Sequence, residues 1–75
     1  MKARAYRISI TPEEKGGFSV VVPTLPGCFT QGETIEEAIE MAKEAISLYI
    51  ESLEEDREVV PDDSRSLEYL VTLTC

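Results

Sequence analysis

The chain has 75 residues, of which 7 are basic and 15 acidic, with no histidine, two cysteines and a net charge of −8. A chain this short forms one small domain that buries roughly 60% of its unfolded surface, so we expect self-association to add stability. A closed zinc site is excluded, because it needs four nitrogen or sulfur ligands. No run of about 18 apolar residues and no apolar signal region is present, which indicates a cytoplasmic protein without membrane association.

The negative charge is concentrated in the middle of the chain. Residues 33–63 hold 12 acids against two bases, Lys43 and Arg57, whereas residues 1–32 hold two acids against four bases. Such a middle would repel a polyanion such as DNA and would steer a basic protein toward itself. We therefore expect a protein partner and no direct binding of nucleic acid.

The first part of the chain has the pattern of a β-hairpin. Residues 3–11 alternate, with Tyr6, Ile8 and Ile10 on one side, which is typical of a strand with one buried face. Residues 18–22 are β-branched or aromatic and apolar nearly throughout, which favours an inner strand. The two strands should pair.

A third strand and a tight turn follow the hairpin. Pro26 and Gly27 fit the two central positions of a type II turn, because glycine accepts a positive φ. Residues 28–31 then form a short strand, and Gly32 allows the chain to turn again.

One long helix is predicted next. Thr34 and Glu37 match a capping box, in which the threonine oxygen caps the first turn and the glutamate reaches back to the N-cap amide. Apolar residues then recur at spacings of three and four to about Asp56, which gives a helix of about 33 Å at 1.5 Å per residue. The stripe that should lie on the sheet consists of Ile35, Ala38, Ile39, Ala42, Ile46, Tyr49, Ile50 and Leu53.

A last strand completes the predicted fold. Residues 57–66 form a polar connection broken by Pro61, and residues 67–74 alternate again. The order βββαβ predicts an α+β fold with a four-stranded mixed sheet, one long helix on one face, and a last strand that returns parallel. Exposed strand edges and an uncovered sheet face lead us to expect a homo-oligomer, either a dimer or a tetramer.

The chain resembles the HicB family of antitoxins over nearly its whole length. The pattern P-x-L-P-G-C-x-x-x-G-x-T-x-x-E-A over residues 23–38, between the hairpin and the helix, carries the likeness. The resemblance implies a partial RNase H-like fold and, as partner, a small basic RNA-cleaving toxin of the HicA type. Members of this family usually add a C-terminal operator-binding domain. Residues 1–75 are expected to be a single HicB-like domain without that DNA-binding domain.

The RNase H likeness does not bring nuclease chemistry with it. That chemistry needs carboxylates converging on two Mg²⁺ ions about 3.5–4 Å apart, and the first strand supplies no acid. Cys28 follows a Pro-Gly turn that could present a nucleophile, but no histidine is available as its base. A free cysteine is commonly a small buried hydrophobe. We therefore expect a protein that is not an enzyme, with no catalytic residue, no metal and no cofactor.

The glutamates of the helix are the remaining candidates for function. Glu36, Glu40 and Glu44 form an i,i+4 row of like charge, and each such pair costs about 0.2–0.5 kcal/mol at low salt. Acids also stand at the helix C-terminus, where the macrodipole disfavours them. A solvated face that keeps the protein soluble is one interpretation. Partner binding is the other, because violations of local rules are common at functional sites.

Two hypotheses follow. In the first, which the resemblance suggests, the chain is a non-catalytic antitoxin that covers the active surface of a HicA-type toxin, with acids that mimic RNA phosphates. In the second, it is an orphan homo-oligomeric scaffold or a small-ligand-binding domain without a toxin. The candidate partner-binding residues are four glutamates of the helix and two apolar residues of the preceding loop: Glu36, Glu40, Glu44, Glu51, Leu25 and Phe29.

Overall fold

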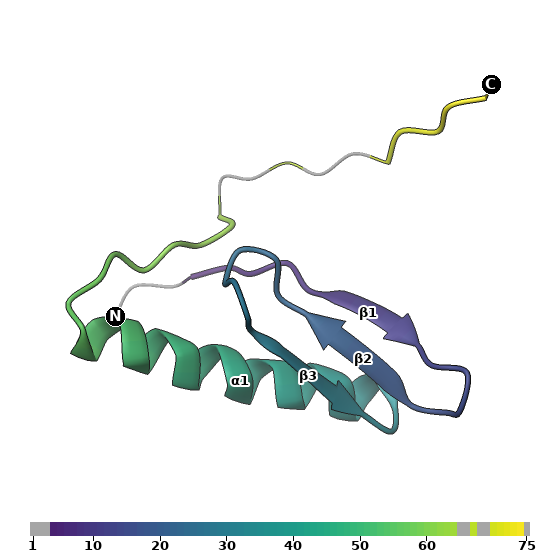
Figure 1. Cartoon of the computed structure of the whole chain (residues 1–75), viewed down its shortest axis with the longest axis horizontal. Helices are drawn as coiled ribbons and strands as arrows, with labels where there is room; N and C mark the ends of the chain where they lie inside the picture. The colour runs from purple at the N-terminus through teal and green to yellow at the C-terminus, as the bar shows by residue number, and fades with distance from the viewer. Residues whose placement is uncertain (1–3, 65–66, 68–69, 75) are drawn as a thin grey trace.

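The computed structural model describes residues 4–64, residue 67 and residues 70–74, and it shows an α+β fold (Figure 1). Three strands form one sheet in the order β1-β2-β3, and both neighbouring pairs are antiparallel. One long helix covers one face of this sheet and leaves the other face uncovered (Figure 1). The elements are β1 (Ser9–Pro12), β2 (Phe18–Val21), β3 (Phe29–Gly32) and α1 (Ile35–Glu55).

The predicted hairpin is confirmed, but its first strand is shorter than expected. β1 pairs with β2 in a register that places Ile10 opposite Val20. Residues 4–8, which the alternation assigns to the first strand, lie outside this ladder. Their backbone is bonded instead to the loop after the helix, where the amide of Asp63 donates to the carbonyl oxygen of Ala5 at 2.7 Å. An alternating sequence alone does not show whether a segment pairs with a neighbouring strand or bonds to a loop.

The Pro-Gly turn before β3 has the predicted geometry. The amide of Cys28 donates to the carbonyl oxygen of Leu25 at 2.9 Å, and Gly27 between them has a φ of 81°. The loop is closed by a second bond, from the amide of Val22 to the carbonyl oxygen of Cys28 at 3.0 Å. These bonds fold the loop back toward the helix, and Leu25 is completely buried.

The predicted N-cap of α1 is confirmed. The amide of Glu37 donates to the Oγ1 atom of Thr34 at 3.1 Å. The Glu37 carboxylate reaches back one residue further than expected, and accepts from the amide of Glu33 rather than from that of Thr34. The helix ends at Glu55, and its last turn contains no basic residue.

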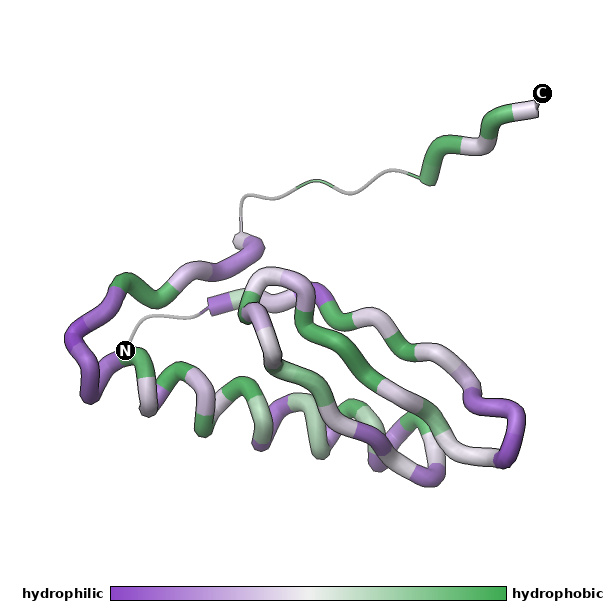
Figure 2. Tube along the Cα trace, viewed as in Figure 1, coloured by the Kyte–Doolittle hydropathy of each residue, from purple (hydrophilic) through white to green (hydrophobic). Residues whose placement is uncertain are grey.

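Two groups of apolar residues form the core between the sheet and the helix. In the first group Val20 packs with Ala38 and Ala42, and in the second the loop residues Leu25 and Cys28 pack with Val22. Figure 2 shows that apolar residues run along β2, which is the central strand of the sheet. Residues packed around the two groups are Tyr6, Ile8, Ile10, Phe18, Ala45, Ile46, Tyr49 and Leu53.

The helix lies so close to β3 that Gly32 has no room for a side chain. A Cβ atom at this position would lie 2.5 Å from the amide nitrogen of Ala38 and 2.7 Å from its Cα. The glycines with a positive φ are Gly16, Gly17 and Gly27, so Gly32 is required for close approach rather than for an unusual backbone angle. The chain bends directly after Gly32, as expected, and the close contact with Ala38 is a second requirement for glycine that the sequence did not indicate.

The predicted fourth strand is not part of the sheet among the described residues. Leu67 and residues 70–74 are paired with none of the three strands. The described C-terminal residues lie away from the helix and the sheet (Figure 1), and Leu70 is 96% exposed. Glu68 and Tyr69, which belong to the predicted strand over residues 67–74, lie outside the described residues. Among the described residues the sheet is therefore three-stranded and antiparallel, and the expected fourth strand and mixed sheet are not seen there.

A buried carboxylate connects three segments that are distant in the sequence. Asp63 is only 9% exposed, and its Oδ2 atom accepts from the amide of Arg7 at 2.8 Å. Its Oδ1 atom accepts from the hydroxyl of Thr24. Nearby, the hydroxyl of Tyr6 donates to the carbonyl oxygen of Pro61. The loop after α1 is thus held against both the N-terminal segment and the loop before β3.

We expect Gly32→Ala to destabilise the protein, because the new methyl group would overlap backbone atoms that cannot move independently. Overpacking of this kind costs about 1–3 kcal/mol, and each kcal/mol lowers the melting temperature by about 4–8 °C in a domain of this size. Thermal unfolding followed by circular dichroism measures the effect. Gln31→Ala, at an exposed neighbouring position of β3, serves as the control, and equal melting temperatures of the two variants would contradict the close contact.

We expect Asp63→Ala to cost about 1.5–3 kcal/mol of unfolding free energy, because the amide of Arg7 and the hydroxyl of Thr24 would lose a charged acceptor. Urea denaturation measures this difference. Glu58→Ala removes the same charge from an exposed position in the same loop, and we expect it to change the free energy by less than about 0.5 kcal/mol. A loss of similar size in both variants would show that charge, not the bonds of Asp63, matters.

Candidate functional site

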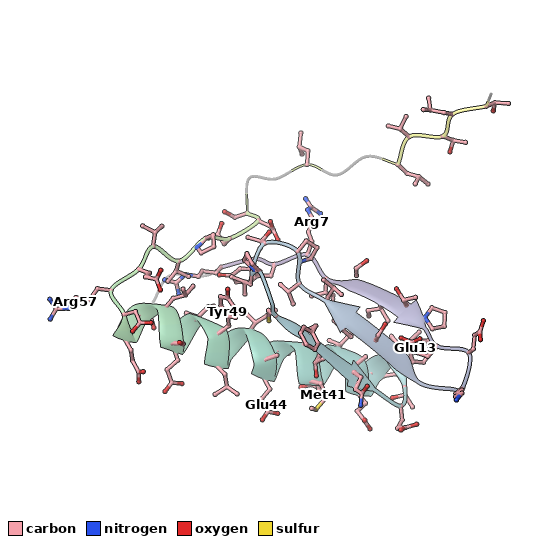
Figure 3. The ribbon with its side chains drawn as sticks, in the orientation of Figure 1. Arg7, Glu13, Met41, Glu44, Tyr49 and Arg57 are labelled. Carbon is pink, nitrogen blue, oxygen red and sulfur yellow. The ribbon has the colours of Figure 1, made fainter. Side chains whose placement is uncertain are left out.

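The four predicted glutamates of α1 lie together on the side of the helix that faces away from the sheet. Ala38 and Ala42 are its buried residues and define the side that contacts the sheet. With 3.6 residues per turn, the four glutamates fall within an arc of about 80° opposite that side. Figure 3 shows Glu44 pointing away from the sheet. We call this group the acidic face; its members are Glu36, Glu40, Glu44 and Glu51, and all four are exposed.

The acidic face is only weakly neutralised. Lys43 lies 3.3 Å from the Oε1 atom of Glu40, and both side chains are about 70% exposed. An exposed pair of this kind contributes at most about 1 kcal/mol, because water and salt screen it. Among the described residues, Glu36, Glu44 and Glu51 make no ion pair. The face therefore presents several solvated carboxylates to an approaching molecule.

The helix also carries exposed apolar residues beside the acidic face, which the sequence did not identify. Leu48 is 62% exposed and Met41 39% exposed, and both lie outside the buried stripe. Figure 3 shows Met41 on the same outer side of α1 as Glu44. The sequence could have predicted these exposed residues, because Met41 and Leu48 are large apolar residues of the helix that do not belong to its buried apolar stripe.

A shallow hollow links Leu48 to Phe29 on β3. Its volume is about 370 Å³, and Phe29 is 73% exposed at its rim. The hydroxyl of Tyr49 donates to the carbonyl oxygen of Pro26 at 2.7 Å, which holds the Pro-Gly loop against the helix beside the hollow. We call Met41, Leu48 and Phe29 the apolar strip. The hollow itself is lined by Gly27, Cys28, Phe29, Ala45, Leu48 and Tyr49.

The two predicted loop contacts have different positions in the structure. Phe29 is exposed and available for contact, whereas the side chain of Leu25 is fully buried in the core. Leu25 therefore supports the loop from inside and presents no side-chain surface to a partner. Leu25 is buried because it lies where two tight turns meet. Its amide donates to the carbonyl oxygen of Val22 at 3.0 Å, and its carbonyl oxygen accepts from the amide of Cys28.

Cys28 is a core residue, as the sequence predicted. Its side chain is 5% exposed, and burial raises the pKa of its thiol above the ordinary value. Burial also raises the pKa of the Tyr6 hydroxyl, with a smaller opposite effect from Arg4. Neither group is therefore activated as a nucleophile or a base. Among the described residues, no three histidine, cysteine or acidic side chains are placed to hold a metal ion.

No helix in the described part of the chain is both long and apolar enough to cross a membrane. The long helix α1 is instead divided between the acidic face and the side that packs on the sheet.

We expect Cys28 to react slowly with thiol reagents in the folded protein, because it is buried and its raised pKa keeps it protonated. In a Cys75→Ser variant, the rate at pH 8 should rise at least about tenfold when the protein is unfolded in urea. The burial of this thiol should contribute to stability below the ordinary thiol pKa, and the contribution should be lost as the pH rises through the raised value. Equal rates in the folded and unfolded states would contradict the burial of Cys28.

Comparison with known proteins identifies the family. The family model described as HicB-like antitoxin of bacterial toxin-antitoxin systems matches residues 6–73. A UPF0150 protein of Thermoplasma acidophilum is 52% identical over 59 residues, which cover 79% of this chain and 86% of that protein.

Two relatives carry the antitoxin name. An antitoxin HicB of Photorhabdus laumondii is 41% identical over 61 residues, covering 81% of this chain and 39% of the relative. The antitoxin HicB of Escherichia coli is 39% identical over 56 residues, covering 75% of this chain and 41% of the relative. The chain thus matches about two fifths of these two antitoxins. From the match to the family model over nearly its whole length, the chain belongs to the HicB-like antitoxin family of bacterial toxin-antitoxin systems.

Proposed function

We propose that the protein is a non-catalytic antitoxin that binds and neutralises a small basic toxin of the HicA type through the acidic face of α1. The observation that carries the proposal is the position of the four glutamates. They share one side of a helix whose opposite side is buried, in a chain that belongs to an antitoxin family. A surface that binds RNA phosphates on a toxin would also attract these carboxylates.

The charge of the acidic face mainly steers the partner, and the apolar strip supplies the close contact. Exposed ion pairs speed association, but each adds little affinity. Binding energy concentrates instead on a few well-packed apolar or aromatic residues surrounded by polar groups. Leu48 follows Glu44 by four residues and precedes Glu51 by three on the same helix, so it would form such a centre with Phe29 across the hollow. Met41 extends the strip toward the start of the helix.

We also propose how the protein would behave in the cell and how it would assemble. The chain would act without catalysis and without direct contact with nucleic acid, because its net charge of −8 repels phosphate. It would act in the cytoplasm, where the RNA that its toxin cleaves is found. It would assemble as a homo-oligomer, and a fourth strand from residues 67–74 would complete a partial RNase H-like sheet.

We expect the double variant Glu40→Lys, Glu44→Lys to bind the toxin about tenfold more weakly than the unmodified chain, mainly through slower association. The affinity should also depend less on ionic strength, because fewer opposite charges meet. Surface plasmon resonance at several salt concentrations measures both effects with a small basic protein encoded next to this chain's gene. An unchanged affinity and an unchanged salt dependence would refute the role of the acidic face.

The matched control is Glu13→Lys, Glu14→Lys, which changes the net charge equally in the turn between β1 and β2. Both positions are exposed and belong to a different element from the acidic face. The control should retain the affinity within about twofold, because long-range steering without contact changes binding only slightly. Equal weakening in both double variants would show that net charge alone is responsible.

A further inference from the structure

A narrow row of residues runs along α1 between the acidic face and the sheet. Met41, Ala45, Leu48 and Ser52 follow one another at spacings of four, three and four, and we call them the outer row. Three of them are exposed and Ala45 is half-buried. With 3.6 residues per turn, this spacing keeps them on one side of the helix. Alternating spacings of three and four form the seam of a coiled coil, for which the described residues supply one helix.

The hollow described above gives the outer row a second wall. Ala45 and Leu48 line it from the helix, and Phe29 lines it from β3. The bond from the hydroxyl of Tyr49 to the carbonyl oxygen of Pro26 holds the loop at the end of this wall. The hollow is therefore already formed in the free chain, and a partner would not need to order the loop first.

Acidic residues follow the other side of the outer row with a regular repeat. Glu37, Glu44 and Glu51 are exposed and lie seven residues apart. Glu37 and Glu44 each precede an apolar member of the row, Met41 and Leu48, by four residues, which places them beside it on the helix surface. Positions that flank a helical seam select the charge of the partner helix. These acids select a partner that carries basic residues along one flank.

The repeat of this surface fits a partner helix better than an extended strand. Met41 and Leu48, like Glu44 and Glu51, are seven residues apart, a distance of about 10.5 Å at 1.5 Å per residue. A heptad of a partner helix repeats over the same distance. Side chains on one face of a strand recur about every 6.6 Å, so they would soon fall out of step. A second copy of α1 would bring glutamates against glutamates, which is repulsive.

From these observations we propose that the partner lays a basic amphipathic helix lengthwise along α1. Apolar residues of that helix, at spacings of three and four, would pack between Leu48 and Phe29. Its lysines or arginines would face Glu44 and Glu51. The inference deepens the proposed function and rests on it for the identity of the partner, because the basic toxin would supply this helix. The fit between the two helices is tested without the toxin.

Designed peptides test whether the surface accepts a helix. The probe is a stapled peptide of about three heptads, with leucine at the two seam positions and lysine at the flanking positions, since short unstapled helices are only marginally stable in water. We expect a dissociation constant of about 10 μM or lower by isothermal titration calorimetry. An unstapled peptide with the same residues, rearranged so that leucine and lysine alternate as in a strand, should bind at least about tenfold more weakly. Equal binding of the two peptides, or no binding of the helical one, would overturn the inference.

A pair of apolar truncations tests whether the helix lies on the outer row. Leu48→Ala should weaken binding of the helical peptide by about tenfold, because it removes the central apolar contact. Val59→Ala truncates another exposed apolar residue, which lies in the loop after α1, and should change binding by less than about twofold. Circular dichroism checks that both variants are folded. An equal loss in the two variants would overturn the inference.

Two charge reversals separate this inference from the proposed function. Glu44→Lys with Glu51→Lys should weaken binding of the helical peptide and of the toxin at least about threefold more than Glu36→Lys with Glu40→Lys. Both changes alter the net charge equally, but the second pair lies further round the helix from the outer row. Equal losses of toxin affinity would overturn the helix docking and leave the proposed function standing. A toxin that does not bind, with the peptide results as expected, would overturn the proposed function and support the helix-binding surface.

Discussion

The contact between Gly32 and the first turns of α1 determines the arrangement of the whole molecule. Since no side chain separates β3 from the backbone at Ala38, the helix lies directly on this part of the sheet. Ala38 and Ala42 are small enough to follow the same approach, and they are the residues of α1 that become buried. A larger residue at any of these positions would lift the helix from the sheet. The orientation of every other helical side chain, acidic or apolar, follows from this contact.

The helix α1 is stabilised at its N-terminus and destabilised by the acidic residues at its C-terminus. The Thr34 hydroxyl accepts from the amide of Glu37 in the first turn, and the Glu37 carboxylate accepts from the amide of Glu33 just before the N-cap. Acids in the first turn also interact favourably with the helix dipole. At the other end, Glu54 and Glu55 face the negative pole of the dipole, and no base stands in the last turn. A purely structural helix would gain stability from lysines at these positions. Since packing on the sheet stabilises the helix anyway, the chain can carry an acidic surface that local rules disfavour.

The sequence predicted the features that depend on neighbouring residues, and it missed those that depend on distant ones. The N-cap at Thr34, the turn at Gly27 and the helix itself were correct because each is decided within a few residues. The tie between Asp63 and the N-terminal segment spans most of the chain, so no local pattern announces it. Of the candidate site, the exposure of the four glutamates was predictable from helical periodicity. The burial of Leu25 was not, because two successive turns reverse the direction that the loop would otherwise take.

The acidic face and the apolar strip lie side by side on α1, so a partner that reaches one also meets the other. Their physical effects differ in range. Charge acts over about 8 Å in physiological salt and brings a basic partner to the helix, whereas apolar contact acts only once the two surfaces touch. In the proposed complex the glutamates would therefore set the rate of association, and Leu48 and Phe29 would set the rate of dissociation. A small acidic domain could in this way bind quickly through solvated charges and firmly through a few apolar side chains, without a large interface.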